Sequence, residues 1–552
     1  MKIQRGFIRK IQDGILYCEG LVYAFIGEMV RIYPSKGKGS EPMIGYVFDL
    51  EHNIAKVALL WGQEKNLTVG NEVFRMHRVP QTRAGVGVLG QIITPLGECI
   101  NHEEIEDVDY FLQMNYFSVY VDMERGAPGV TKREPVRIPL YTGCAAVDCF
   151  FPVGRGQREL IIGDNKTGKT TLALTAIINQ KRLNINSWLE LSKHFKRLSN
   201  MPWDPSIGFT PCIYVAVGQK RAEIVRIRST LEAYNATFYT CIVFTSADQL
   251  ATLQYLAPYA GCAIGEWFRD KGYHALIVYD DLTQHAVAYR QMSLLLRRPP
   301  AREAYPADIF YVHSRLLERA AQLSFKLGGG SLSALPIIET QLGDISAYIP
   351  TNVISITDGQ IFLSRRIANS GRRPAVDFGL SVSRVGAASQ VPVMAAISKI
   401  AKISYSAYRR YAGIERVGGD IPIVIQYVID RGKRMNEFMT QPQYVTYGLY
   451  EQALGLYLYS STFFDGIDVK YTKMSIKILF SKKFAQTYLT GRARMLALNA
   501  EDFEPMLMSI PFDIIKKDFD QIGKGIRKVM LSLQRVMKGN REIEEELCAI
   551  VR

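Results

Sequence analysis

Hydrophobic and polar residues alternate in short runs through the first part of the chain, up to about residue 85. Two such runs are MIGYVFDL, residues 43–50, and IAKVALLW, residues 54–61. Alternation with a period of two places one set of side chains on each face of a strand. Short strands separated by turn residues are typical of a small closed β-sheet. The sequence therefore predicts an N-terminal β-barrel domain over residues 1–85.

The pattern changes from about residue 157, where strand-like apolar runs alternate with segments of helical spacing. This order is typical of an α/β fold, in which a parallel sheet carries helices on both faces. The expected strands are RELIIG, CIYVAVG, FYTCIVFTS and HALIVYDD, and the expected helices are KTTLALTAIINQK and RAEIVRIRSTLEAY.

Two further changes of pattern set the remaining boundaries. Residues 183–211 interrupt the alternation with a segment far longer than the ~2–6 residues usual between a helix and a strand, so we expect a surface insertion. From about residue 391 strand signals fade and apolar residues recur with helical spacing. The sequence therefore predicts a central domain over residues 86–390 and a helical C-terminal domain over residues 391–552.

Amino-acid composition excludes only a few classes of protein. A chain of 552 residues is too long for one core, and no apolar run reaches the ~18–20 residues needed to span a bilayer. The net charge of +14 could match nucleic acid, an anionic membrane surface or acidic partner subunits; an acidic partner or a basic compartment is the interpretation we favour. Of eight scattered cysteines, Cys212 and Cys241 lie in strand-like runs, so we expect buried free thiols.

The stretch GDNKTGKTT, residues 163–171, has the spacing of a phosphate-binding loop between an expected strand and an expected helix. Gly163 and Gly168 permit close approach of the backbone, whose N–H groups face the phosphates at the start of the helix. Lys169 would reach the outer phosphates, and the hydroxyl of Thr170 would bind Mg²⁺. The motif predicts a nucleotide site.

Hydrolysis needs further groups on neighbouring strands. Asp280, directly after the apolar run of HALIVYDD, is our candidate for the Mg²⁺ side, whereas Asp281 is expected to cap the next helix. A glutamate often ends the strand that follows the loop helix, but here the position is Gln219. A glutamine cannot accept a proton, although in some GTPases it orients water. We expect Glu223 to be an ordinary acid in the first turn of a helix.

Long segments of the chain resemble the alpha subunits of rotary ATP synthases. The resemblance covers most of residues 86–390 and extends, through the barrel-like start and the QPQY segment near residue 441, to nearly the whole chain. The segments that carry it are VGRGQRELIIGDNKTGKTTLA, CIYVAVGQKR, ALIVYDDLTQHAVAYRQMSLLLRRPPAREAYPADIFYVHSRLLERAA, YIPTNVISITDGQIFLS and FGLSVSRVGAASQ.

The resemblance implies a β-barrel, a RecA-like nucleotide domain and a helical C-terminal domain. It also implies a ring of three alpha and three beta subunits around a central gamma stalk, with peripheral stalk subunits and without nucleic acid. Alpha subunits of this family bind ATP or ADP with Mg²⁺ without turning it over, and Gln219 stands where their non-catalytic glutamine belongs. The loop residues that would contact the nucleotide are Gly163, Asp164, Asn165, Lys166, Thr167, Gly168, Lys169, Thr170 and Thr171.

The resemblance further assigns residues outside the loop. SVSRVG places the family's arginine finger, which acts in the adjacent beta site, at Arg384 with Ser383 beside it; such fingers accelerate phosphoryl transfer by ~10³–10⁵. The family's adenine pocket would include Arg373, Pro374, Gln441 and Gln443.

Departures from the family pattern raise one hypothesis. The usual loop is GDRQTGKT, whereas Asn165 and Lys166 replace its Arg-Gln pair here. We expect Lys166 to supply the missing cation near the phosphates. Ala368 replaces the family's aromatic residue near the adenine, so the base would be packed more loosely.

Two other classes of protein share the phosphate loop. A Rho-like hexameric RNA helicase also places a barrel before its motor, and a catalytic secretion-type ATPase shares the central fold; Gln219 argues against both. The start is unlike a transit peptide, the pI is near 9.2, aromatic residues are many and residues 183–211 form a divergent insertion. Together with the resemblance, these features favour a protein encoded within the organelle, on the matrix side of the mitochondrial inner membrane. The alternative is the cytoplasmic side of a bacterial plasma membrane.

Overall fold

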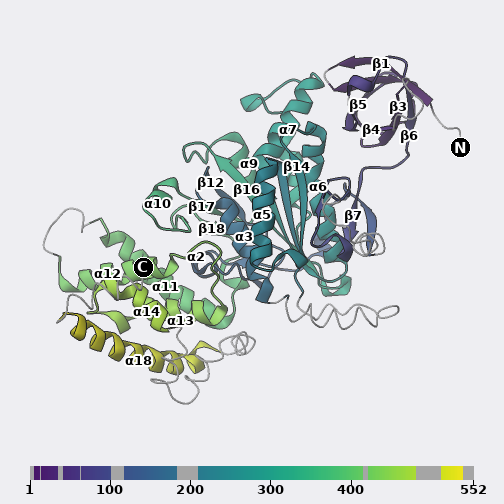
Figure 1. Cartoon of the computed structure of the whole chain (residues 1–552). Helices are drawn as coiled ribbons and strands as arrows, with labels where there is room; N and C mark the ends of the chain where they lie inside the picture. The colour runs from purple at the N-terminus through teal and green to yellow at the C-terminus, as the bar shows by residue number, and fades with distance from the viewer. Residues whose placement is uncertain are drawn as a thin grey trace. The chain divides into compact units, whose positions relative to one another are not determined.

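The computed structural model describes residues 5–12, 14–34, 42–62, 64–100, 117–182, 184, 209–413, 421–479 and 511–538. Most of the expected insertion at residues 183–211 lies outside these ranges. The chain divides into two compact units, each assembled from three segments. Unit 1 comprises Met1–Val136, Arg155–Asn165 and Gln180–Gln360, and unit 2 comprises Arg137–Gly154, Lys166–Asn179 and Ile361–Arg552. Figure 1 shows the elements of both units.

Unit 1 begins with a closed barrel of six strands in the order β1-β2-β5-β4-β3-β6, which confirms the predicted N-terminal barrel. Alternating side chains such as Leu16, Val30, Val57 and Val73 are fully buried inside it. β7 (Gln81–Gly85) does not join the barrel but pairs antiparallel with β9 (Ser118–Asp122). The barrel strands are β1 (Arg5–Gln12), β2 (Ile15–Glu19), β3 (Met29–Tyr33), β4 (Met43–Glu51), β5 (Ile54–Trp61) and β6 (Glu72–Arg75).

The second part of unit 1 is a parallel sheet, as predicted, in which β12, β16, β15, β13, β14 and β8 lie side by side in that order. Nearly every side chain of its central strands is buried, because helices pack against the sheet. The strands are β8 (Ile92–Ile93), β12 (Leu160–Asp164), β13 (Cys212–Gln219), β14 (Thr240–Ser246), β15 (His274–Asp280) and β16 (Ser331–Thr340).

Helices of unit 1 approach the sheet closely. A Cβ atom at Gly261 of α6 would lie 2.3 Å from Val215 Cγ2, so only glycine permits this packing. α6 and α7 also pack against each other. The helices of this unit are α5 (Arg221–Ala233), α6 (Ala251–Asp270), α7 (Leu282–Leu295), α8 (Ile309–Leu317) and α9 (Tyr348–Ile356).

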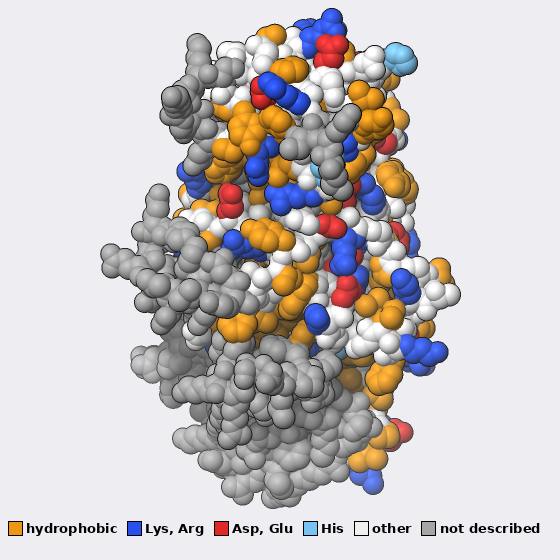
Figure 2. Space-filling model, turned by 90° about the vertical axis from the view of Figure 1, so that its right-hand side faces the viewer, with side chains coloured by type: hydrophobic (Ala, Val, Ile, Leu, Met, Phe, Trp, Pro, Cys, Tyr) orange, Lys and Arg blue, Asp and Glu red, His pale blue; other side chains and the backbone are white. Residues whose placement is uncertain are grey.

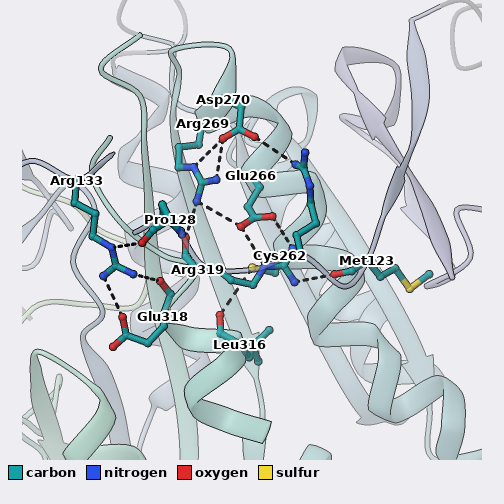
Figure 3. A network of polar contacts seen from close by, with 11 residues as sticks. Met123, Pro128, Arg133, Cys262, Glu266, Arg269, Asp270, Leu316, Glu318 and Arg319 are labelled. Atoms are coloured by element: carbon teal, nitrogen blue, oxygen red, sulfur yellow. Dashed lines mark hydrogen bonds and ion pairs between the residues drawn. The ribbon is translucent and has the colours of Figure 1, made fainter. Parts of the chain in front are cut away.

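A buried ion pair connects α6 with the segment that follows α8 (Figure 3). Arg319 Nη2 and Nε donate to the two carboxylate oxygens of Glu266 at 2.6 and 3.1 Å, and both side chains are only 1% exposed. Arg319 also donates to the backbone oxygen of Met123 at 2.7 Å, and Arg269 donates to the backbone oxygen of Arg319 at 2.6 Å. The network therefore fixes three chain segments of unit 1.

Unit 2 contains the phosphate-loop helix and the C-terminal helices, whose presence confirms the predicted helical domain. α11 packs against α12 and α13, and α18 packs against α13 and α14. The elements are β10 (Pro139–Leu140), α2 (Ala145–Phe150), β11 (Val153–Gly154), α3 (Lys169–Asn179), β17 (Gly359–Leu363), α10 (Arg365–Asn369), β18 (Val382–Ser383), α11 (Pro392–Tyr411), α12 (Ile423–Met439), α13 (Leu449–Ser460), α14 (Thr472–Leu479) and α18 (Phe512–Lys538).

The described cysteines are free thiols, and all of them except the half-buried Cys99 are buried, as expected for Cys212 and Cys241. Burial raises the pKa of the Cys18 thiol to about 12 and that of Cys262 to about 11. Lys and Arg side chains are scattered among hydrophobic ones over the face drawn in Figure 2. Among the described helices, none has the length and apolarity required to cross a bilayer.

Candidate functional site

The phosphate loop connects β12, which ends at Asp164, to α3, which begins at Lys169. Lys166 and Gly168 have positive φ angles of 63° and 98°, so the backbone turns sharply between strand and helix. No heavy atom lies within 4 Å of the position that a Cβ would occupy on Gly168. This open space beside the backbone is what a bound phosphate requires.

Asp164, expected among the nucleotide contacts, has its carboxylate bound to protein. Its Oδ1 accepts hydrogen bonds from the hydroxyl of Thr340 and the N–H of Gly343, both at 2.7 Å. Thr340 ends β16 and stands opposite Asp164 in the parallel ladder. Asp164 therefore anchors the entry to the phosphate loop on the neighbouring strand.

Gln219 and Asp280, which the sequence placed at the ends of separate strands, lie together. Gln219 Nε2 donates to the backbone oxygen of Asp280 at 3.0 Å, and the Tyr214 hydroxyl donates to Asp280 Oδ2 at 2.5 Å. Burial, and then the neighbouring carboxylate, raises the pKa of Tyr214 well above its ordinary value, so the phenol keeps its proton. The amide of Gln219 thus acts here as a hydrogen-bond donor.

The two neighbouring acids have the roles expected of them. Asp281 precedes α7 and its Oδ1 accepts the N–H of Gln284 at 2.7 Å, which is a helix N-cap. Glu223 lies in the first turn of α5 and pairs with Arg226 one turn further along. Both predictions are confirmed.

A hollow of about 360 Å³, which the sequence did not indicate, lies beside the start of α7. Thr283, Gln284 and Arg290 of α7 line it together with Glu339 at the end of β16, whose N–H donates to Thr283 Oγ1 at 3.0 Å. Ligands of open α/β sheets bind at the carboxyl ends of the parallel strands. The position of Glu339, at the end of an apolar run, could therefore have indicated this hollow from the sequence.

The segment around Arg384 is held on both sides of that residue. Ser383 Oγ donates to the backbone oxygen of Pro152 at 2.8 Å, and Gln390 Nε2 donates to the backbone oxygen of Asp148 at 2.9 Å. Between these anchors Arg384 is exposed, and it forms no ion pair with any described carboxylate. The local structure therefore presents a guanidinium on a fixed segment.

The expected adenine-pocket residues lie near one another in unit 2. The backbone N–H of Gln441 donates to the backbone oxygen of Arg373 at 2.9 Å, and both Arg373 and Gln443 are exposed, with Pro374 half-buried. The buried side chain of Gln441 binds protein: it accepts the Ala145 N–H at 2.9 Å and donates to the backbone oxygens of residues 143 and 445. Its amide holds the start of α2 in place.

Asp148, which no motif in the sequence indicates, holds the loop of residues 141–145 that leads into α2. Its buried carboxylate accepts the N–H groups of Thr142 and Gly143 at 2.9 and 3.0 Å and the amide of Gln452 at 2.9 Å. Burial raises the pKa of this carboxyl, and the hydrogen bonds oppose that shift. Asn179, at the end of α3, donates to the backbone oxygen of Tyr141 at 2.9 Å, so this loop also contacts the phosphate-loop helix.

Comparison with known proteins accounts for this arrangement. Residues 143–383 match the nucleotide-binding domain of the ATP synthase alpha/beta family, and residues 390–493 match the C-terminal domain of the ATP synthase alpha/beta chain. The chain is 46% identical to the ATP synthase subunit alpha of Anaplasma phagocytophilum over 84% of its own length and 85% of that relative. The chain belongs to the family of ATP synthase alpha subunits.

Two further relatives give the same result. Identity is 44% to the ATP synthase subunit alpha of Neorickettsia sennetsu, over 84% of each chain, and 42% to that of Orientia tsutsugamushi, over 85% of each chain. The match to the nucleotide-binding domain of the family includes the whole of residues 163–171.

Two of the expected residues, one in each unit, carry oxygen atoms of the kind that bind magnesium. Mg²⁺ prefers oxygen ligands, and it is usually bound through one or two protein groups, phosphates and waters. Thr170 offers a hydroxyl in the first turn of α3, and Asp280 offers a carboxylate at the end of β15.

Proposed function

We propose that this alpha subunit holds a nucleotide without hydrolysing it and assists catalysis in a neighbouring beta subunit. In this proposal the complex is a proton-translocating ATP synthase with three alpha and three beta subunits, a central gamma stalk and a peripheral stalk. The observation that carries the proposal is the exposed guanidinium of Arg384, on a segment held at Ser383 and Gln390.

The retained nucleotide is ATP or ADP with Mg²⁺, bound by residues 163–171. The open space beside Gly168 supports close approach of the phosphates to the backbone. Thr170 would ligate Mg²⁺ directly and Asp280 through water, and the ion would neutralise phosphate charge. Lys166 supplies a further cation to the phosphates, so Lys166→Ala should weaken nucleotide affinity.

The hydrogen bonds around Gln219 support the absence of turnover in this site. Its amide cannot take a proton from water, and its N–H₂ group is directed to the backbone oxygen of Asp280. Lack of a general base typically costs ~10²–10⁴-fold in rate. The site therefore retains its nucleotide.

Four residues of unit 2 would recognise the adenine base, three of them directly and one indirectly. Arg373, Pro374 and Gln443 would contact the adenine, because none of them is buried. Gln441 would act indirectly, since its side chain binds the backbone at residues 143, 145 and 445. Ala368 leaves no aromatic ring to stack on the base.

Arg384 would stabilise the charge that spreads over the transferring phosphoryl group in the beta site. A fixed segment helps, because little ordering is required when the guanidinium enters that site. A lysine keeps the charge but loses the planar, forked geometry of the guanidinium.

The test compares ATP hydrolysis by the purified chain alone with that of the heterohexamer assembled with its beta subunit. We expect no turnover by the chain alone, strong turnover by the assembly, and a loss of ~10³-fold or more in an Arg384→Lys assembly. Brisk hydrolysis by the chain alone would overturn the proposal. RNA-stimulated hydrolysis would favour the helicase, and RNA-independent hydrolysis a catalytic secretion-type ATPase.

We place the complex at the mitochondrial inner membrane, on the matrix side. The named relatives come from bacteria, which supports the bacterial plasma membrane as the competing location. Fractionation of the source cells, followed by detection of the chain with an antibody, distinguishes the two.

A further inference from the structure

A basic pocket of about 640 Å³ lies in unit 2 directly beside the Arg384 segment. Its rim includes Lys402, Arg409 and Arg410, which are exposed on α11, and its wall includes Val382 and Ser383 of β18. Ser383 immediately precedes Arg384, so whatever fills the basic pocket also contacts the strand that ends just before this arginine.

The floor of the basic pocket is an aromatic cluster. The ring of Phe378 lies 4.7 Å from the rings of both Phe150 and Tyr405, measured between centroids. The Tyr405 hydroxyl is fixed by a donor from Arg372 at 3.2 Å and donates to Asn436 at 3.0 Å. The floor is therefore formed before any ligand binds, which reduces the entropic cost of binding.

No acid in the described part of the chain neutralises the cations of the rim. Lys402, Arg409 and Arg410 form no ion pair with a described carboxylate. Asp377, the acid beside Arg409, instead accepts the N–H of Gly379 at 2.8 Å. Two of the cations lie in the last turn of α11, where they interact favourably with the helix dipole, but Lys402 lies about two turns earlier.

The spacing of these charges identifies the kind of ligand. Lys402 and Arg410 are eight residues apart, so they are separated by about 12 Å along the helix axis. The side of a helix offers a lone phosphate no cradle of free N–H groups. A polypeptide with two or more spaced carboxylates can contact both cations, and an apolar side chain can cover Phe378 and the 47%-exposed Val382.

We propose that the basic pocket receives an acidic segment with an apolar anchor, contributed by the beta subunit into whose site Arg384 reaches. This inference rests on the proposed function, because that function identifies the neighbour of β18. Because β18 is already held within the chain, docking of the segment brings the beta subunit into register with Arg384. Electrostatic attraction at the rim mainly accelerates association and makes it sensitive to salt.

The test uses the heterohexamer assembled from the full chain and its beta subunit. A Lys402→Glu/Arg410→Glu variant should need ~10-fold more protein for half-maximal assembly, and its assembly should depend less on salt. The matched control is Lys516→Glu/Lys517→Glu, which reverses two exposed charges on α18 and should assemble like the wild type. Equal assembly of the two variants would overturn the inference.

A second measurement identifies the occupant even if the charge reversals impair folding. A photo-crosslinking amino acid at Ser406, an exposed residue of the pocket, should join a beta-subunit peptide that contains at least two Asp or Glu residues. Crosslinking to a basic peptide or to another subunit would contradict the proposal.

If Arg384→Lys abolishes hydrolysis while the Lys402→Glu/Arg410→Glu variant assembles normally, the proposed function stands and only this inference fails.

Discussion

At the end of β13, the side-chain amide of Gln219 makes a hydrogen bond that a carboxylate could not make. The side chain donates to the backbone oxygen of Asp280 at 3.0 Å, next to the carboxylate that accepts the Tyr214 hydroxyl. A glutamate there would have no proton to donate at neutral pH and would bring a second negative charge beside Asp280. The local hydrogen bonding therefore favours glutamine at this position, independently of the proposed absence of hydrolysis.

We therefore expect Gln219→Glu to lower the free energy of unfolding by about 1–3 kcal/mol, because the backbone oxygen of Asp280 loses its donor and like charges approach. Urea unfolding of the purified chain at pH 7 measures the change. Gln219→Met removes the donor without adding charge, so the difference between the two variants isolates the repulsion. An unchanged free energy of unfolding in Gln219→Glu would contradict the expectation.

At the scale of elements, α7 and α8 meet through two buried histidines. The rings of His285 and His313 lie 5.4 Å apart, and neither ring nitrogen of His313 has a hydrogen-bond partner within the described residues. Burial lowers the pKa of His313 to about 4 and that of His285 well below its ordinary value. Both rings are therefore neutral in the folded chain.

These pKa values make stability depend on pH in a definite direction. Between pH 6.5 and 4 the unfolded chain binds more protons than the folded one, so the free energy of unfolding decreases as the pH falls, by about 3 kcal/mol for His313 alone. Urea unfolding at several pH values measures how the free energy of unfolding changes with pH. In His313→Leu this slope should decrease by up to the equivalent of one bound proton. His52→Leu, which replaces an exposed histidine, should leave the dependence unchanged.

The buried ion pair of Arg319 and Glu266 leads to a second prediction about the free energy of unfolding. Removal of one partner leaves an uncompensated buried charge, so Glu266→Leu should cost about 3–5 kcal/mol. The double variant Glu266→Leu/Arg319→Met should cost less than the sum of the single changes. The more exposed Arg228–Glu232 pair on α5 is the control, and its removal should cost about 0.5 kcal/mol or less. Thermal or urea unfolding measures all of these changes.

At the scale of the whole molecule, local patterns in the sequence predicted the elements but not how distant segments combine. The strands of the sheet, the barrel and the phosphate loop follow from periodicity and motif spacing. The contact between Gln441 and Ala145 joins residues 296 positions apart, and no local pattern indicates it. The same is true of Asp148, whose carboxylate binds an amide at Gln452, and of the three segments that make up unit 2.

The burial of the thiols has a practical consequence for spectroscopy. Thiolates attack maleimide and methanethiosulfonate reagents, and a pKa of about 11 or higher leaves almost no thiolate at neutral pH. Cys99 is the partly accessible thiol among the described residues, and Cys548 lies outside them. With these two replaced by serine, a cysteine introduced at Ser406 would carry a spin label or fluorophore at a single site. Such a label would report the approach of a neighbouring subunit in real time, without interference from the native thiols.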